Sequence, residues 1–358
     1  PYTTLFRSIE QEEGITMKVS VVILNWNGCD MLRTFLPSVV RYSEGEGIEV
    51  CVADNGSTDA SVTLLQQEFP SVRTIVLDQN YGFADGYNLA LQQVDAEYVV
   101  LLNSDVEVTE HWLKPMIAYL DKHPEVAACQ PKIRSQRQKE YFEYAGAAGG
   151  FIDKYGYPFC RGRIMGVVEK DEGQYDTVIP VFWATGAALF IRRADYVNVG
   201  GLDGRFFAHM EEIDLCWRLR SRNREIVCVP QSIVYHVGGA TLKKENPHKT
   251  FLNFRNNLVM LYKNLPQEEL NKVMRIRICL DYLAAFNFLL QGHWDNASAV
   301  MRARKEYKRL CPSFSLSREE NMRKKTLNPI PERTKSSILW QFYVRGCKRF
   351  SQLSDLKG

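Results

Sequence analysis

The chain has 358 residues, of which 45% are hydrophobic and 24% are charged. This balance is typical of a folded protein with a large core and excludes a disordered chain or a fibrous repeat. The formal net charge of +3 conceals an uneven distribution, because residues 1–240 carry 22 Lys and Arg against 32 Asp and Glu, whereas residues 241–358 carry 23 against 10. A basic tail favours an anionic partner such as a membrane surface, a phosphorylated lipid or a nucleic acid; a solvated helix bundle is the alternative.

The first residues look foreign to the rest of the chain. Residues 1–8, PYTTLFRS, resemble the translation of a sequencing-library adapter, and Met17 directly precedes a strand pattern. We therefore take residues 1–16 as a non-native or disordered leader.

The nine cysteines form no CxxC pair, and no secretory signal precedes Met17, so we expect reduced thiols and a cytoplasmic location.

Short β-branched runs alternate with helical patterns in the first third of the chain. The runs are residues 19–24, 48–54, 72–77 and 97–102. Their nearly continuous apolar character predicts the strands of a doubly wound parallel sheet buried on both faces, with helices in the intervals.

The later part of the chain is less regular. Residues 134–182 are rich in Gly and Tyr and predict irregular connections. We expect a strand at 184–193, a helix at 210–221, two short strands at 225–229 and 232–237, a helical basic region from about 249, and a loss of periodicity after 312. The longest apolar stretch, 276–290, is too short and too polar to span a bilayer.

Polar side chains and glycines follow each of the four predicted strands, where ligands bind in such sheets. They are NWNG at 25–28, DNGSTD at 54–59, NYGF at 80–83 and NSD at 103–105. The Asp54 carboxylate can accept a hydrogen bond from a base or a ribose, although a turn with a helix N-cap is the alternative interpretation of this segment. Asp105 can bind a hard divalent cation that bridges a diphosphate, whereas Glu107 and Glu110 are explained by the start of a helix.

Three acids in the helix predicted at 210–221 cannot share one role. Glu211 and Asp214 lie on one face, and Asp214 is placed to pair with Arg218. Glu212 is left to face a substrate, and the aromatic residues before it favour a raised pKa that suits a general base.

His236 ends a late strand beside glycines and is a weaker candidate for a metal or phosphate ligand, since a lone histidine is usually structural. The chain lacks GxxxxGK[ST], GxGxxG after the first strand and GxSxG. These absences remove the main support for a P-loop ATPase, a dinucleotide dehydrogenase and an α/β-hydrolase.

Six segments between residues 19 and 239 resemble, in order and spacing, the family 2 inverting glycosyltransferases of GT-A fold, most closely the bacterial rhamnosyltransferase-like branch. They are VSVVILNWNG, VADNGSTDAS, NYGFADGYNLAL, YVVLLNSDVEV, TGAALFIRR and GGLDGRFFAHMEEIDLCWRL. The resemblance implies an α/β GT-A domain with a mostly parallel sheet at 17–240 and a helical, basic extension at 241–358.

The resemblance also implies roles for individual residues. The donor nucleotide sugar would be contacted by Asn25, Asn27, Asp54, Asn55, Asn80, Gly82, Phe83, Gly86, Asn103 and Ser104. Mg²⁺ or Mn²⁺ would be held by Asp105, Asn103 and His236, and Asn103 replaces the first Asp of the family's Asp-x-Asp motif with a weaker ligand. Glu212 matches the second acid of the Glu-Asp motif and would be the catalytic base, one methylene longer than the usual Asp.

The implied activity is inverting sugar transfer, with rhamnose the first candidate, from a dTDP- or UDP-sugar to a saccharide or a polyprenyl-diphosphate-linked acceptor in cell-surface polysaccharide synthesis. A nucleotidyltransferase and a non-catalytic glycan-binding protein are the alternatives, and no nucleic-acid partner is expected.

In residues 272–290, apolar Val273, Ile276, Leu280 and Leu283 accompany Arg275 and Arg277. This pattern predicts peripheral contact with an anionic membrane, the cytoplasmic face of the inner membrane, unless the helices simply pack on the body.

Overall fold

The computed structural model describes residues 17–238 and 246–353. The predicted leader at 1–16 and the predicted boundary between residues 240 and 241 lie outside the described residues. The division into a domain and an extension therefore stays a prediction.

A large, mostly parallel sheet forms the centre of the fold, in the strand order β11-β13-β6-β12-β4-β1-β2-β3, with β5 paired to β13. The strands are β1 (Met17–Asn25), β2 (Ile48–Asn55), β3 (Arg73–Leu77), β4 (Ala96–Asn103), β5 (Val106–Val108), β6 (Val126–Ser135), β11 (Ile179–Pro180), β12 (Ala188–Arg192) and β13 (Glu225–His236). All four strands predicted at the start of the chain are confirmed, and they pair in parallel. The strand predicted at 184–193 is the shorter β12, which runs antiparallel to β4 and β6.

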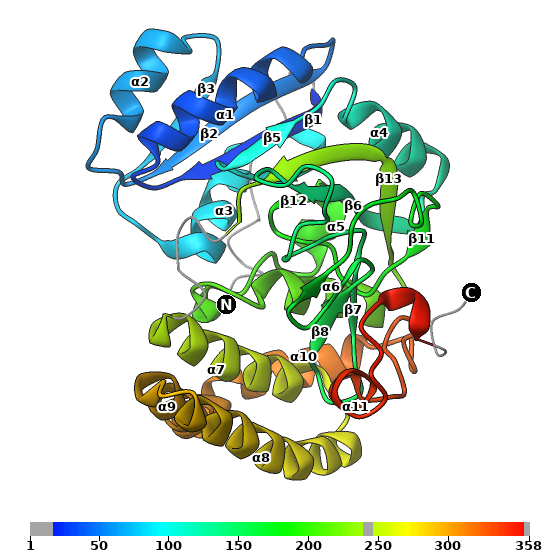
Figure 1. Cartoon of the computed structure of the whole chain (residues 1–358). Coiled ribbons are helices and arrows are strands. Elements are labelled where there is room, and N and C mark those ends of the chain that lie inside the picture. Colours follow the sequence, from blue (N-terminus) through cyan, green and yellow to red (C-terminus); the bar gives the residue numbers. More distant parts are fainter. Residues whose placement is uncertain (1–16, 239–245, 354–358) are drawn as a thin grey trace.

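Both faces of this sheet are buried, as its apolar strands predict. In β1, Val21 and Ile23 belong to one apolar core, and Val22 between them belongs to the other. Helices cover both faces (Figure 1). They are α1 (Cys29–Tyr42), α2 (Ser61–Glu68) and α4 (Leu113–Lys122) on one core, and α3 (Gly82–Gln92), α5 (Arg193–Asn198) and α6 (Glu211–Ser221) on the other.

The region predicted to be irregular, 134–182, contains a second sheet that sequence analysis missed. Its antiparallel strands are β7 (Gly150–Ile152), β8 (Pro158–Cys160), β9 (Arg163–Ile164) and β10 (Val167–Val168). Strands of two or three residues are too short to display an alternating pattern, which explains the miss. The two strands predicted at 225–229 and 232–237 form the single strand β13, with a register shift between Val229 and Ile233.

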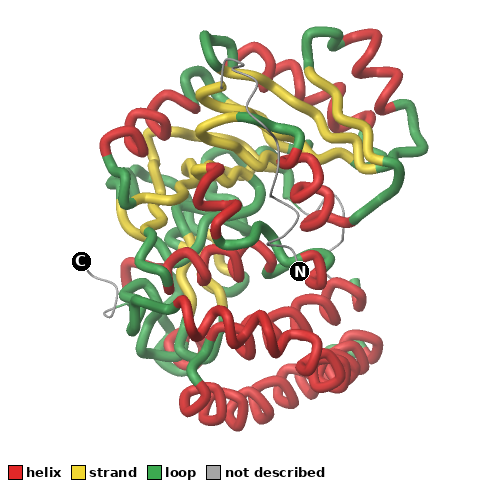
Figure 2. Tube along the Cα trace, turned by 180° about the vertical axis from the view of Figure 1, so that it is seen from behind, coloured by secondary structure: helices red, strands yellow, loops and turns green. Residues whose placement is uncertain are grey.

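The C-terminal region is helical, as predicted, and its helices stack on the side of the molecule away from β1–β3 (Figure 2). They are α7 (Pro247–Asn264), α8 (Gln267–Leu290), α9 (Trp294–Leu310), α10 (Ser315–Lys324) and α11 (Ile338–Tyr343). The last two continue helical structure beyond Pro312, where the sequence lost its periodicity. No helix among the described residues combines the length and the hydrophobicity that crossing a membrane requires.

Buried polar contacts attach the C-terminal region to the sheet domain. Arg220 at the end of α6 forms a bidentate ion pair with Glu332, at 2.9 and 2.8 Å. The Ile338 amide donates to Asp153 over 2.9 Å, and the Phe350 amide donates to Glu169 over 2.9 Å. The described part of the C-terminal region therefore belongs to the same packed body as the sheet.

Candidate active site

The ends of β1 and β2 hold one buried carboxylate. Their register sets Asn25 opposite Asp54, and both side chains are fully buried. Asn25 Nδ2 donates to Asp54 Oδ2 over 3.1 Å, and the Ser57 amide donates to Asp54 Oδ1 over 2.9 Å. Asp54 thus lies at the carboxyl edge of the sheet and accepts hydrogen bonds from neutral donors only. Its carboxylate oxygens have lone pairs left for a ligand.

Asn27 links the loops that follow β1 and β2 by hydrogen bonds. Its Oδ1 accepts from the Thr58 amide over 2.7 Å, and its own amide donates to Ser57 Oγ over 2.9 Å. Asn27 is exposed, so it lies at the rim of the site and not inside it. The neighbouring Gly28 has no room for a side chain, because a Cβ there would lie 2.4 Å from Asn25 Oδ1.

The loop after β3 is shaped by two asparagines. Asn55 Nδ2 donates to Asn80 Oδ1 and to the Gly82 carbonyl, both over 3.0 Å, and the Tyr81 amide donates to Asn55 Oδ1 over 3.0 Å. Gly82 has a φ of +75°, and a Cβ on it would lie 3.1 Å from the Phe207 ring. Asn55 and Asn80, which were predicted to contact the nucleotide sugar, therefore form hydrogen bonds that fix the shape of this loop.

Gly86 and Phe83 have different positions on α3. A Cβ on Gly86 would lie 2.9 Å from Leu24, so this glycine allows α3 to approach β1 closely. The half-buried Phe83 ring instead faces Gly186, at 3.4 Å from the position of a Cβ there. Gly86 is thus a packing position, and Phe83 lies on the open side.

A second polar cluster forms where β4 and β13 end. Asp105 Oδ1 lies 3.1 Å from His236 Nε2, and Asn103 Nδ2 lies 3.5 Å from the same nitrogen. Ser104 lies between them in sequence, and its Oγ is 3.8 Å from the position of a Cβ on Gly28. The three residues predicted as metal ligands are therefore neighbours in space.

Sequence analysis missed a buried acid in this cluster, Glu143. Its Oε2 lies 3.5 Å from His236 Nδ1, and Glu143 is only 5% exposed. Burial alone would lower the pKa of His236, but the carboxylates of Asp105 and Glu143 raise it to about 10. Burial also opposes ionisation of Asp105, yet His236 holds the pKa of its carboxyl below the ordinary value. The cluster accommodates positive charge between two acids.

The start of α6 brings a third acidic group to the site. Asp214 is fully buried and accepts hydrogen bonds from Arg218 over 2.9 Å and Lys263 over 2.7 Å, which confirms the predicted pair and makes it structural. Glu211 and Glu212 each have a buried carboxylate oxygen without a hydrogen-bond partner in the structure. Burial, and then the Glu212 charge, raise the pKa of Glu211 well above its ordinary value, and burial raises the pKa of Glu212.

Glu212 differs from Glu211 in being partly exposed. Its Cβ lies 3.7 Å from the position of a Cβ on Gly186, the same glycine that Phe83 faces. A side chain larger than hydrogen at Gly186 would therefore stand between the aromatic ring and the acid. This places Glu212 across Gly186 from Phe83, in the first turn of α3.

The segment that leads into α6 is strained and is held from α7. Phe207, His209 and Met210 have φ of 67°, 71° and 74°, which bulky side chains rarely adopt. Asn256 Nδ2 lies 3.0 Å from the Phe206 carbonyl and 2.8 Å from those of Ala208 and His209. Asn256 is the second residue that sequence analysis missed, because nothing before folding connects it with this loop.

Residues 20–189 match the family model described as glycosyl transferase family 2. The chain is 27% identical over 236 residues to N-acetylglucosaminyl-diphospho-decaprenol L-rhamnosyltransferase of Mycobacterium tuberculosis, with 62% of this chain and 76% of that protein covered.

Two solved structures have the same fold. GalNAc-T7 with UDP, GalNAc and Mn²⁺ has a TM-score of 0.56 at 15% identity, covering 90% of this chain and 60% of that chain. S. aureus TarS 1-349 in complex with UDP-GlcNAc has a TM-score of 0.53 at 15% identity, covering 86% and 89%.

The GT-A fold and the polar carboxyl edge of its sheet, together with these similarities, define a glycosyltransferase. Residues 20–189 form a glycosyl transferase family 2 domain, and the chain is similar to rhamnosyltransferases. Its activity is sugar transfer in glycan biosynthesis.

Proposed function

We propose that this enzyme transfers a sugar, rhamnose being the first candidate, from a dTDP- or UDP-sugar to a polyprenyl-diphosphate-linked saccharide with inversion at the anomeric carbon. One observation carries the proposal: the polar clusters that end β1, β2 and β4 lie at one sheet edge, and Glu212 lies across Gly186 from Phe83 at the start of α3. The named acceptor of the mycobacterial relative, a diphospho-decaprenol, supports the acceptor class.

The donor's nucleotide lies at the ends of β1 and β2 in this proposal. The Asp54 carboxylate, fixed by Asn25 and Ser57, accepts from the imide N–H of a pyrimidine base. Asn55 and Asn80 act by fixing the β3–α3 loop, and Phe83, in the first turn of α3, faces the sugar. Asn27, Gly82, Gly86, Asn103 and Ser104 stay predicted members of the donor site.

A divalent cation fits the cluster at the ends of β4 and β13. Asp105 offers a carboxylate and Asn103 an amide oxygen, and His236 would offer an imidazole once the cation displaced its proton; Mg²⁺ and Mn²⁺ accept such donors. No group of three or more His, Cys, Asp or Glu side chains in the described ranges is preassembled as a metal site, so donor phosphate oxygens would complete the ligand set. The cation would neutralise charge on the departing diphosphate.

Replacing Asp105 by Ala should weaken donor binding in the presence of Mn²⁺ about 10- to 100-fold and leave the weaker metal-free binding nearly unchanged, because an ion-pairing ligand is lost. Calorimetric titration of UDP or dTDP with and without Mn²⁺ measures both values. Glu107→Ala is the matched control. Glu107 lies two residues after Asp105 in the sequence, but its carboxylate pairs with Lys139 at 2.8 Å. An unchanged Mn²⁺ dependence in Asp105→Ala contradicts the assignment.

The proton in the reaction goes to Glu212. Its carboxylate removes the proton from an acceptor hydroxyl as that oxygen bonds to the anomeric carbon, and the bond from that carbon to the diphosphate oxygen breaks on the opposite side. A single displacement of this kind inverts the configuration. Phe83 and the 207–210 segment exclude water from the carboxylate, which fits the raised pKa of Glu212.

Asn256 acts in this scheme as a positioning residue for Glu212. Asn256→Ala should lower kcat more than tenfold with little change in the KM for the donor, because a displaced base costs rate and not donor affinity. Steady-state kinetics at varied donor concentration measures this split. Asn271→Ala, at an exposed asparagine of α8, is the control, and a change confined to KM contradicts the role.

The protein works, in this proposal, at the cytoplasmic face of the inner membrane, where a polyprenyl-linked acceptor resides. The excess of basic residues in 241–358 supports contact with anionic lipid. Two residues of the predicted amphipathic pattern do not contribute, since Val273 and Arg277 are buried, and Arg277 pairs with Asp281 at 3.1 Å. Ile276 and Leu283 are 40% and 62% exposed, so the apolar surface of α8 is narrower and lies further along the helix.

A panel of nucleotide sugars tests the activity. With Mn²⁺ and a lipid-linked saccharide, the enzyme should release a nucleoside diphosphate from one or two donors, dTDP-rhamnose being the first. Pyrophosphate release from a nucleoside triphosphate would instead indicate nucleotidyl transfer. Failure to release nucleotide from any sugar donor contradicts the proposed activity.

A further inference from the structure

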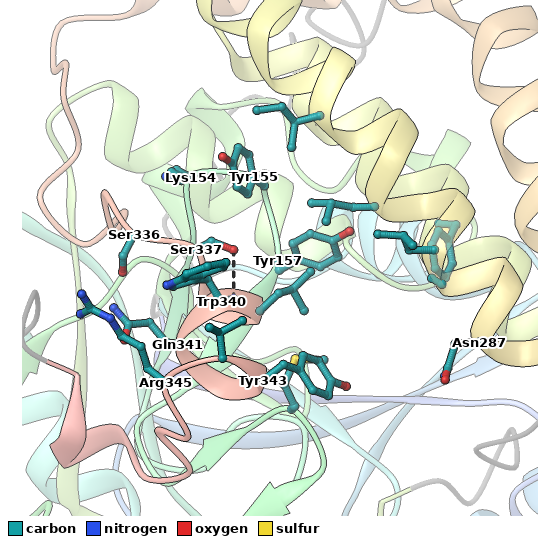
Figure 3. A pocket seen from close by; sticks show the side chains of 18 residues that line it. Lys154, Tyr155, Tyr157, Asn287, Ser336, Ser337, Trp340, Gln341, Tyr343 and Arg345 are labelled. Atoms are coloured by element: carbon teal, nitrogen blue, oxygen red, sulfur yellow. Dashed lines mark hydrogen bonds between the residues drawn. The ribbon is translucent and has the colours of Figure 1, made fainter.

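A large groove lies between α8 and α11, outside the site described so far. Its volume is about 980 Å³, and its walls come from α8, from α11 and from the turn at 154–157 between β7 and β8. Figure 3 shows Tyr155 and Tyr157 of the turn and Trp340 and Tyr343 of α11 facing the groove, with α8 along the other side. A volume of this size suits a bulky small molecule.

The walls of the groove are apolar and exposed. Leu283 on α8 is 62% exposed. Trp340 and Tyr343 on α11 are 57% and 69% exposed, and Val344, which follows α11, is 59% exposed. A second hollow of about 450 Å³ lies between α8 and α9, with Phe286 among its lining residues. Contiguous exposed apolar surface of this kind marks a binding site.

The charged residues that line the groove are both basic. Lys154 lies in the turn, with its Nζ 5.0 Å from the centre of the Tyr155 ring, and Arg345 follows α11. Tryptophan and tyrosine with one apolar and one polar end, beside basic groups, suit a ligand that has an apolar chain and an anionic head.

The turn at 154–157, which lines the groove, is connected to the start of α6 through the side chain of Asn257. Arg277 donates to the Tyr155 carbonyl over 3.0 Å and to Asn257. Asn257 Nδ2 in turn donates to the Gly156 carbonyl over 2.6 Å and lies 3.9 Å from Met210 Sδ. Met210 is the N-cap of α6, two residues before Glu212. A ligand in the groove therefore lies behind the start of the helix that carries the base.

We propose that this groove holds the isoprenoid chain of the acceptor, with the diphosphate at Lys154 and Arg345; the inference rests on the lipid-linked acceptor of the proposed function. A concave pocket accommodates a single chain, whereas a flat bilayer contacts only its rim. A second copy of the protein is a poorer occupant, because a two-fold interface would bring the basic C-terminal regions of both copies together. The chain positions the acceptor sugar toward α6.

Acceptors that differ only in chain length test the proposal. We compare KM for a sugar diphosphate carried on a long polyprenol with KM for the same sugar diphosphate on farnesol, and expect the long chain to bind more tightly. Leu283→Gln and Val344→Gln should each raise the long-chain KM by about tenfold, since each loses most of the burial of one apolar side chain. Leu316→Gln, at a residue of α10 that is 73% exposed, is the control and should change neither KM.

A photoreactive long-chain polyprenyl phosphate, irradiated with the full-length protein, gives a direct measurement. Label on peptides from α8 and α11, reduced by Leu283→Gln, supports the groove. Label elsewhere, or equal KM values for the two chain lengths in the unaltered protein, overturns it while sugar transfer to lipid acceptors stands. Transfer to free saccharide alone overturns the proposed acceptor itself. Loss of sedimentation with phosphatidylglycerol vesicles in Leu283→Gln, with chain-length preference intact, assigns the surface to the bilayer and overturns the proposal.

Discussion

Glu212→Gln is expected to lower the rate of sugar transfer about 10²- to 10⁴-fold, the usual contribution of a general base. The amide keeps the size of the side chain but cannot take a proton, so donor affinity should stay within about twofold on the same argument. Single-turnover transfer, together with calorimetric titration of the donor nucleotide, measures the two effects separately.

The pH dependence provides a second check on the same residue. Burial raises the pKa of Glu212 above its ordinary value of 4.5, and the base works only when ionised. The value of kcat/KM should therefore rise with pH up to a pKa above 4.5 and then level off. Glu211→Gln is the matched control, since the Glu211 carboxyl is more deeply buried; if it abolishes transfer and Glu212→Gln does not, the base is misassigned.

Glu332→Ala should lower the free energy of unfolding by about 3–5 kcal/mol, because it leaves the Arg220 guanidinium buried and unpaired. Arg220 and Glu332 are 3% and 7% exposed and are joined by two parallel contacts. Urea denaturation followed by circular dichroism measures the change.

The surface pair of Glu306 and Arg309, at 2.6 Å and with side chains 26% and 73% exposed, is the control for this prediction. Glu306→Ala should cost about 0–1 kcal/mol, since water screens such pairs. Replacing both Arg220 and Glu332 by apolar residues of similar size should recover most of the lost stability. A loss below about 1 kcal/mol in Glu332→Ala contradicts the importance of the buried pair.

The sheet and its polar edge could be predicted because buried parallel strands form unbroken apolar runs whose ends stand out in the sequence. Asn25, Asp54 and Asp105 each follow such a run, and parallel pairing brings them to one edge of the sheet. Asp214 and Arg218 could be paired because helix geometry sets residues four apart on one face. These predictions depend on local periodicity alone.

Features made by contacts between distant segments were missed. Glu143 meets His236 only because residues 133–147 fold back beside β13, and Asn256 reaches the 206–209 carbonyls from a helix some fifty positions later. The small sheet at 150–168 consists of strands too short to show a pattern. The amides of Asn55 and Asn80 look identical in the sequence whether they contact a ligand or a loop, and only the folded geometry shows that they build the loop.

The hydrogen bonds from Asn256 to carbonyls of the 206–209 segment affect how this enzyme can be re-engineered. Exchanging the segment after residue 240 with that of a relative, to change which acceptor is used, would also exchange the anchor of the loop in front of Glu212. A chimera joined after α7 keeps both the anchor and the loop from one parent and replaces the helices that follow, including those that line the groove. The end of α7, at Asn264, is therefore a better junction for such grafts than the charge boundary near 240.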